Sequence, residues 1–315
     1  TACRRQRQMC IRDRKWIVII ASISVCLACF SLWFFAVGFW STCLIWGVVG
    51  SGLAGTYMPG LQVLNDRLNM TDRVKLTPWY TSSFGLSNGI SFAVIGYLFA
   101  NFSWKIACYT TSISAALSAI IILFLITSHN QKKNITERKF FDLRPAFKNK
   151  EALGYIFSYG THTYELFAYR AWIFTFLLWA SLRTPNTISS ELISLIIGIF
   201  MFIGMVSSLM GAKFCLDYGR KKVLMIIGFA TFVFSVICAI SISLPIWIII
   251  ILVGIYHAFI MLDSGALTAG TVSVSDDNER GAILAFHSII GFAGGAIAGP
   301  IIGFILDVNG GTNNI

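Results

Sequence analysis

The sequence predicts an all-α polytopic membrane protein, and three observations support that prediction. Of the 315 residues, 56% are hydrophobic and only 12% are charged, and the mean hydropathy is +0.75. Soluble domains are roughly half apolar and about a quarter charged. The apolar residues also gather into stretches of about 20, the length of a helix that crosses the hydrocarbon core of a bilayer. Because these stretches do not alternate between apolar and polar residues, they predict transmembrane helices and not transmembrane strands.

Nine such stretches can be distinguished along the chain. They are residues 16–37, 43–64, 78–101, 105–127, 153–181, 189–211, 222–243, 246–270 and 281–306. Beyond residue 15, one alternating set of connections carries fifteen basic residues, from Arg67 to Arg280, whereas the other set carries only Lys105 and Arg183. This asymmetry predicts that the basic connections face the cytoplasm. The net charge of +10 is then mostly a topology signal, so the expected partner is a lipid bilayer and no nucleic acid.

The first residues are predicted to be a non-native leader that covers residues 1–14. Residues 9–14, MCIRDR, are what the end sequence of a widely used sequencing transposon encodes, and no initiator methionine precedes them. Such segments are excluded from fold reasoning. The alternative is an ordinary basic cytoplasmic segment.

Metal, cofactor and enzyme signatures are not expected. Cys26 and Cys29 form a CxxC pattern, but inside a lipid-spanning helix they are better interpreted as two small apolar residues on one face. The sequence contains no Walker loop, no HExxH and no GxSxG in a strand-to-helix context. We therefore predict no metal site, no cofactor and no enzyme.

A repeat suggests that the chain has two homologous halves. Gly96 follows Arg73 by 23 residues, and Gly303 follows Arg280 by the same distance, which gives an offset of 207 residues. The polar segment between the halves is the only long hydrophilic stretch. The predicted organisation is the leader 1–14, an N-terminal bundle 15–127, a cytoplasmic connector 128–152 and a C-terminal bundle 153–315.

The stretch GAKFCLDYGRKK, residues 211–222, concentrates one acid and four bases in an apolar chain. Gly211, Asp217, Gly219, Arg220 and Lys221 match the residues of the pattern G-x-x-x-D-x-x-G-R-[RK], with two additional residues before Asp217 and one fewer after it, so the stretch is one residue longer than the pattern. Together with the two halves and the basic central connector, this match makes the chain resemble the major facilitator superfamily of bacterial type. The resemblance implies two pseudo-symmetric bundles, with the nine spans as helices three to eleven of twelve and the first two and the twelfth absent.

The resemblance also suggests a gating role for this stretch. Its glycines would allow a close approach between a loop and a helix end. Asp217 could face a helix N-terminus and pair with Arg220, which would hold the two bundles together while the carrier is open outward. The alternative is that Arg220, Lys221 and Lys222 only anchor the topology.

A second glycine pattern, Gly295-x-x-x-Gly299-Pro300-x-x-Gly303, resembles an antiporter signature but lies in the wrong half of the chain. The favoured interpretation is therefore tight helix packing by small residues.

The segment YIFSYGTHTYELFAYRAW is the richest candidate for binding cargo. At 100° per residue its polar side chains fall within an arc of about 140°. They are Tyr155, Ser158, Tyr159, His162, Glu165, Tyr169 and Arg170, with Gly160, Phe167, Ala171 and Phe174 opposite. In the family the seventh helix lines the central cavity, as does the tenth, which here carries His257 and Asp263.

Each ionisable residue in this segment suggests a role. Glu165 lies near the middle of its span, where desolvation favours the neutral carboxyl and suits a proton carrier. Arg170 cannot lose its charge and suits an anionic substrate group. His162 could relay protons to Glu165 or simply hydrogen-bond it. The alternative is a buried network with a structural role only.

The predicted span 246–270, the counterpart of the family's tenth helix, adds a constraint. His257 and Asp263 are about 120° apart on a straight helix, so both could not point at one cavity. His287, on the last predicted span, is interpreted as a packing residue.

The expected function is secondary active transport of a small solute by alternating access. Proton-coupled symport of a small anion or organic acid is the favoured form, with protons as coupling ion and a small-molecule substrate as partner. The alternatives are efflux by proton antiport and a non-transporting sensor with the same fold. A monomer in the plasma (inner) membrane is expected.

Overall fold

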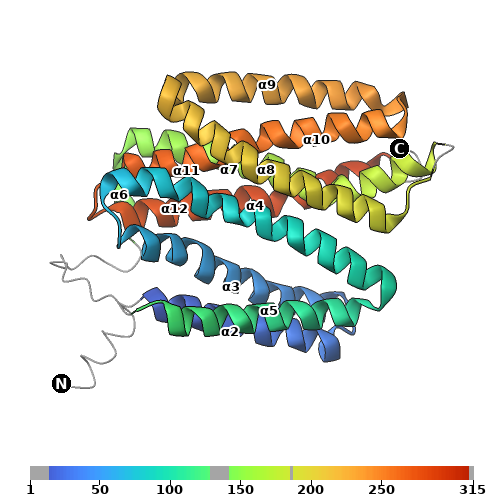
Figure 1. The fold of residues 1–315 in the computed structure, drawn as a ribbon, viewed down its shortest axis with the longest axis horizontal. Coiled ribbons are helices and arrows are strands. Elements are labelled where there is room, and N and C mark those ends of the chain that lie inside the picture. The colour runs from blue at the N-terminus through green and yellow to red at the C-terminus, as the bar shows by residue number, and fades with distance from the viewer. Residues whose placement is uncertain (1–13, 128–141, 185–186, 312–315) are drawn as a thin grey trace. The chain divides into compact units, whose positions relative to one another are not determined.

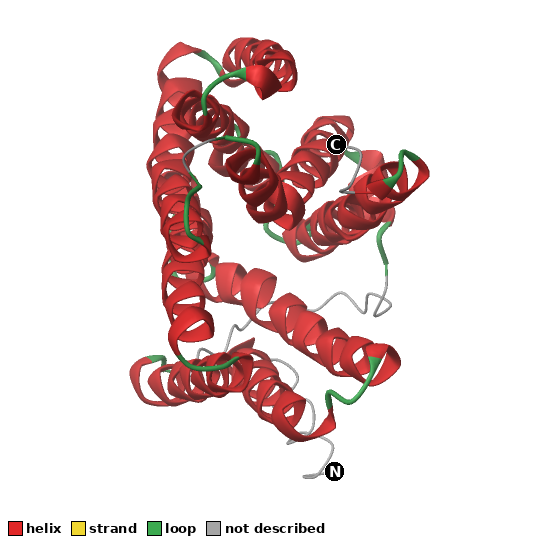
Figure 2. Ribbon diagram, turned by 90° about the vertical axis from the view of Figure 1, so that its right-hand side faces the viewer, coloured by secondary structure: helices red, strands yellow, loops and turns green. Residues whose placement is uncertain are grey.

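The computed structural model describes residues 14–127, 142–184 and 187–311, and within these ranges the chain forms helices and no strand (Figure 2). The predicted leader, apart from Arg14, and residues 128–141 of the predicted connector lie outside the described residues. Two compact units form. The first comprises Thr1–Asn69 with Leu98–Asp142, and the second comprises Met70–Tyr97 with Leu143–Ile315. These units differ from the predicted bundles in the placement of Met70–Tyr97, and the bundle boundaries stay a prediction.

The first unit contains three long helices. They are α2 (Arg14–Phe35), α3 (Phe39–Asn65) and α5 (Trp104–Leu125), and α2 packs against both of the others (Figure 1). Gly52 makes the first contact close, because a Cβ there would overlap the Val25 side chain. Lys15 donates to the carbonyl of Leu123 at 2.9 Å, near the C-terminal end of α5. The last carbonyls of a helix lack partners within it, so this basic side chain stabilises the end of α5.

The second unit contains the remaining helices. They are α4 (Met70–Asn101, up to Tyr97 in this unit), α6 (Arg144–Lys148), α7 (Lys150–Leu182), α8 (Ser190–Tyr218), α9 (Arg220–Ile240), the 3₁₀ turn η1 (Ser241–Ser243), α10 (Ile246–Leu262), α11 (Ser264–Ser273) and α12 (Arg280–Val308). α7 packs along α12 and also contacts α10 and α11, while α8 contacts α9, α10 and α11 (Figure 1). α7 is therefore surrounded by the segments that carry the other candidate site residues.

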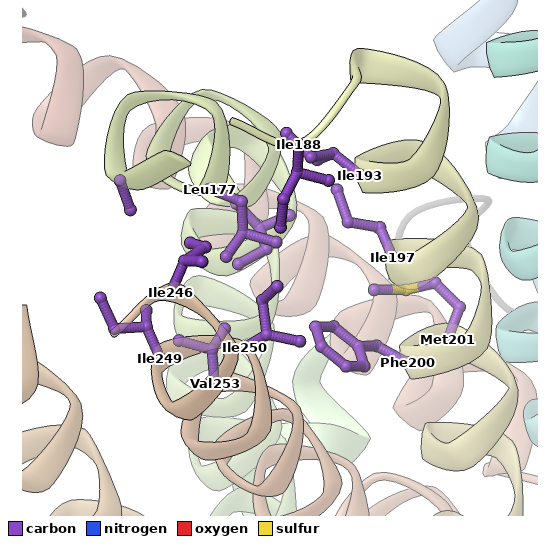
Figure 3. Packing of buried hydrophobic residues seen from close by; sticks show 12 residues of the cluster. Leu177, Ile188, Ile193, Ile197, Phe200, Met201, Ile246, Ile249, Ile250 and Val253 are labelled. Atoms are coloured by element: carbon purple, nitrogen blue, oxygen red, sulfur yellow. The ribbon is translucent and has the colours of Figure 1, made fainter. Parts of the chain in front are cut away.

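An apolar cluster joins α7, α8 and α10. Leu177, Ile193 and Ile249 are buried members, one from each helix, and Figure 3 shows where they lie in the cluster. In lipid, burial of such side chains gains little hydrophobic free energy, because the acyl chains are equally apolar. Van der Waals packing therefore stabilises this cluster, which fixes α10 against α7.

All nine predicted spans are helical, and seven of the described helical segments are long and apolar enough to cross a membrane. The remaining two, α3 and α7, are long enough, with 27 and 33 residues, but they are more polar. α3 is diluted by glycine, and α7 carries Glu165 and Arg170 in its interior. The polarity that excludes α7 from the apolar set is the same polarity that makes it a candidate site.

The predicted span 189–211 was too short, and most of the predicted 211–222 loop is helical. α8 continues to Tyr218, and only Gly219 separates it from α9. Gly219 has φ +90°, a left-handed conformation that side chains other than glycine rarely adopt. No apolarity is needed to extend a helix beyond the bilayer, so the hydropathy pattern did not show where α8 ends.

The predicted span 246–270 was treated as one straight helix, but the helix is interrupted at Asp263. α10 ends at Leu262 and α11 begins at Ser264. Gly211 of α8 lies against the interruption, where a Cβ would overlap the carbonyl of Leu262. This predicted motif residue therefore allows α8 to approach the end of α10, as the motif suggested.

Glycines also bring α12 close to α7. A Cβ on Gly295 would overlap the ring of Phe167, and one on Gly303 would press on Trp172. The interpretation of the Gly295–Gly303 pattern as tight helix packing is confirmed. The apolar side of α7, predicted to include Gly160 and Phe167, is the side that packs on these glycines.

Candidate functional site

Glu165 lies half-buried in the middle of α7 and meets α10. The hydroxyl of Tyr256 donates a hydrogen bond of 2.6 Å to Glu165 Oε1. A carboxyl group away from water needs such a donor if it is to remain charged. The sequence analysis did not select Tyr256, although it is the only tyrosine of α10 and is adjacent to His257.

His162 forms its shortest contact with Asp263. Its Nδ1 lies 2.7 Å from Asp263 Oδ1, and the imidazole is buried. The sequence analysis expected His162 to relay protons to Glu165 or to hydrogen-bond it, and it did not predict the contact with Asp263. The straight-helix argument against Asp263 was wrong, because His257 and Asp263 both contact α7.

His257 contacts α7 at a different level. Its ring is fully buried and stacks on Tyr169 with centroids 4.8 Å apart. The hydroxyl of Tyr169 donates to the carbonyl of Val253 at 3.4 Å. His257 and Asp263 therefore both contact α7, but they do so at different levels along that helix.

Tyr159 lies near two histidines. Its ring stacks on His287 of α12 with a centroid distance of 3.9 Å and on His162 at 5.9 Å. His287 is fully buried, in agreement with the packing interpretation. Its Nδ1 also lies 3.2 Å from Thr271 Oγ1, a contact that periodicity alone could not show.

Arg170 extends the polar side of α7 toward α4. Its guanidinium lies over the ring of Phe84, 5.0 Å from the centroid, and the residue is half-buried. A cation over an aromatic face is stabilised by the ring quadrupole, more strongly when it is desolvated. This contact holds a permanent positive charge inside the second unit.

The gating stretch shows contacts other than the predicted ones. Arg220 donates to Ser273 Oγ of α11 at 2.9 Å and lies over the ring of Tyr155, 5.8 Å from its centroid. Asp217 is exposed, and no ion pair joins it to Arg220 in the described part of the chain. Because both partners of Arg220 belong to the second unit, a role for this stretch between bundles stays a prediction, as does a role for the exposed Lys221.

A charge cluster that the sequence analysis missed connects α4 to the start of α12. Asp277 Oδ1 accepts from Arg73 at 2.7 Å and lies 2.6 Å from Arg280. The hydrogen bond from Arg280, together with the charges of both arginines, lowers the pKa of the Asp277 carboxyl. The signal was present in the sequence, since Arg73 and Arg280 are the residues that mark the 207-residue repeat.

The site thus combines titratable carboxyl groups with a fixed positive charge within one unit. Its carboxyl groups, Glu165 and Asp263, have separate partners, and Arg170 supplies a fixed positive charge. Among the described residues, no group of three or more histidines, cysteines and acids has the arrangement of a metal site.

Several long apolar helices define an integral, multi-pass membrane protein. The family model of the Major Facilitator Superfamily matches residues 10–183 and again residues 164–313. The chain therefore belongs to this superfamily, whose members are transporters and not enzymes, and it is a secondary transporter. No curated protein matches the chain.

Proposed function

We propose that this transporter moves a small anion or organic acid by proton-coupled symport and alternating access, with Glu165 as the proton carrier. The single observation that supports the proposal best is the Glu165–Tyr256 hydrogen bond of 2.6 Å, which places an ionisable group at the contact of α7 and α10. An acid in a membrane span is costly unless it is paired or faces a cavity, and such residues commonly mark proton pathways.

The roles of the neighbouring residues follow from their chemistry. A carboxyl with one hydrogen-bond donor can alternate between a charged and a neutral form as its surroundings change. Arg170 keeps its charge throughout, so it suits the anionic group of the substrate. The Phe84 ring stabilises this charge inside the second unit, where an anionic substrate group could approach it.

The proposal includes a membrane orientation. The excess of basic residues in one set of connections favours a cytoplasmic location for Arg73, Arg220 and Arg280. We place the protein as a monomer in the plasma (inner) membrane, with a small-molecule substrate and protons as its partners.

The test uses the protein in liposomes that contain a pH-sensitive dye. Radiolabelled inorganic phosphate, lactate and succinate are offered with an inward proton gradient. Uptake of any of them with proton entry supports symport, and Arg170→Ala should weaken its apparent affinity. Glu165→Gln should abolish proton entry, whereas Glu191→Gln, which removes an exposed acid at the start of α8, should have no effect.

Two outcomes would replace the proposal. Solute export driven by proton entry would indicate antiport. Binding of a solute without flux in any direction, unaffected by Glu165→Gln, would indicate a sensor. Unchanged proton-coupled uptake in Glu165→Gln would remove Glu165 as the carrier.

A further inference from the structure

Three aromatic rings lie near one another with nearly parallel planes inside the second unit. The imidazole of His287 lies on the ring of Tyr159 at 3.9 Å and 16°, and Tyr159 lies on the imidazole of His162 at 5.9 Å and 22°. His287 and His162 are buried, with exposed fractions of 0% and 4%. The proposed transport function gives His287 no role, although its ring is one of the three.

The orientation of His287 is fixed by α11. Thr271 Oγ1 lies 3.2 Å from His287 Nδ1 and donates its own hydrogen to the carbonyl of Leu267 at 3.1 Å. A hydroxyl has one hydrogen to donate, so toward His287 the Thr271 oxygen acts as acceptor. His287 Nδ1 therefore carries the hydrogen, and the ring is held in one tautomer and one plane.

α12 has a matching space for the Tyr159 ring. Gly291 lies one turn after His287, and a Cβ there would overlap the edge of Tyr159. The Thr163 hydroxyl donates to the carbonyl of Gly291 at 2.8 Å, which ties this turn of α12 to α7. His287 supplies a face for Tyr159, and Gly291 removes the side chain that would push the ring away from it.

The Tyr159 ring also lies nearly parallel to the imidazole of His162, with centroids 5.9 Å apart, and His162 Nδ1 lies 2.7 Å from Asp263 Oδ1. The close stack on His287 resists rotation of the Tyr159 ring about χ2, because rotation would break that contact. The titratable groups that surround the His162–Asp263 pair are Glu165 and Tyr159 of α7, His257 of α10, His287 of α12 and Cys215 of α8.

We propose that His287 is a positioning residue: through Tyr159 it holds the His162 imidazole beside Asp263. The contact between α7 and the junction of α10 and α11 is then set in part from α12, a helix that holds none of the proposed proton-binding groups. The proposal extends the proposed function, because the oriented pair is part of the candidate proton pathway.

The test is an infrared pH titration of the full chain in lipid bilayers, which requires no substrate. The protonated-carboxyl band of Asp263 is assigned by its loss in Asp263→Asn. His162→Phe gives the direction and size of the shift in titration midpoint that follows from loss of the pair. We expect His287→Asn, which keeps a donor near Thr271 but removes the ring, to shift the midpoint in the same direction by at least about 0.5 pH unit.

The matched variant is His287→Phe, which keeps a flat ring and removes the hydrogen bond to Thr271. It should titrate within about 0.2 pH unit of the unchanged protein, because the stack on Tyr159 survives. Tyr159→Leu should shift the midpoint as His287→Asn does, and Tyr159→Phe should not. This second pair tests the stack if His287→Asn does not fold.

Two results would overturn the proposal. If His287→Asn and Tyr159→Leu both titrate like the unchanged protein, His287 only fills space. If His287→Phe shifts the midpoint as far as His287→Asn, the contact with Thr271 matters and the stack does not. Glu165→Gln retains the Asp263 band, so the geometry can be tested even if proton flux proves independent of Glu165.

Discussion

The two compact units are built from similar long apolar helices but differ in where they carry charge. In α2, α3 and α5 of the first unit, the charged side chains, such as Lys15 and Lys105, lie at helix ends. In the second unit, Glu165 and Arg170 lie inside α7, and Asp263 interrupts a span. Intramembrane charge is costly and is retained where it has a function. Among the described residues, the ionisable side chains inside helices are therefore those of the second unit.

The largest expected effect tests this asymmetry directly. Glu165→Gln should reduce proton entry about 100-fold, the lower range for loss of a proton-transfer group. Ser112→Ala removes a buried hydrogen bond of 2.8 Å to Cys26 in the first unit and should change proton entry less than about twofold, since a neutral bond carries no proton. Dye-monitored proton flux into liposomes measures both. Equal loss in the two variants would contradict the assignment of the chemistry to the second unit.

A smaller effect is expected from the glycine that allows α8 to approach the interruption of α10. Gly211→Val should lower the free energy of unfolding by about 3 kcal/mol or more, because the backbone carbonyl of Leu262 cannot move aside as a side chain could. Gly228→Val is the matched control, since a Cβ at Gly228 meets nothing within 4 Å. Thermal unfolding in detergent compares the two. Similar melting temperatures would show that α8 and α10 are not closely packed there.

The third prediction concerns the donor to Glu165. Tyr256→Phe keeps the ring and removes the 2.6 Å hydrogen bond. Proton entry should fall about tenfold, because a hydrogen bond to a charged group contributes roughly 1.5–3 kcal/mol. Tyr164→Phe, on α7 but outside the predicted polar arc, is the control in the same flux measurement. An unchanged rate in Tyr256→Phe would mean that Glu165 carries protons without this donor.

The smallest effect is expected at Asp277, whose carboxyl is 55% exposed and has a lowered pKa because of Arg280 and Arg73. A carboxyl with a lowered pKa stabilises the folded state above its unfolded pKa of about 3.9 and loses that contribution as the pH falls through the folded value. Asp277→Asn should thus melt slightly lower than the unchanged protein at pH 7, and the difference should vanish at strongly acidic pH. A difference that grows on acidification would contradict this sign.

The helical class and the family could be predicted from the sequence because hydropathy, topology and the match at 211–222 are all local patterns. The polar side of α7 followed equally from the 100° periodicity. The partners on that side could not be predicted in the same way. The His162–Asp263 pair depends on a helix break at Asp263, and the position of Tyr256 depends on how α10 packs against α7. Neither the interruption at Asp263 nor the packing of α10 leaves a periodic signal in the sequence, so these contacts could not be predicted from it.

The junction at Gly219 has a mechanical consequence. A single residue separates the 29-residue α8 from α9, so the connection is too short to let the two helices move independently. Arg220 is the first residue after this junction, and its guanidinium donates a hydrogen bond to Ser273 at the end of α11. We therefore expect a tilt of α8 to move α11 as well, because no flexible loop separates α8 from Arg220.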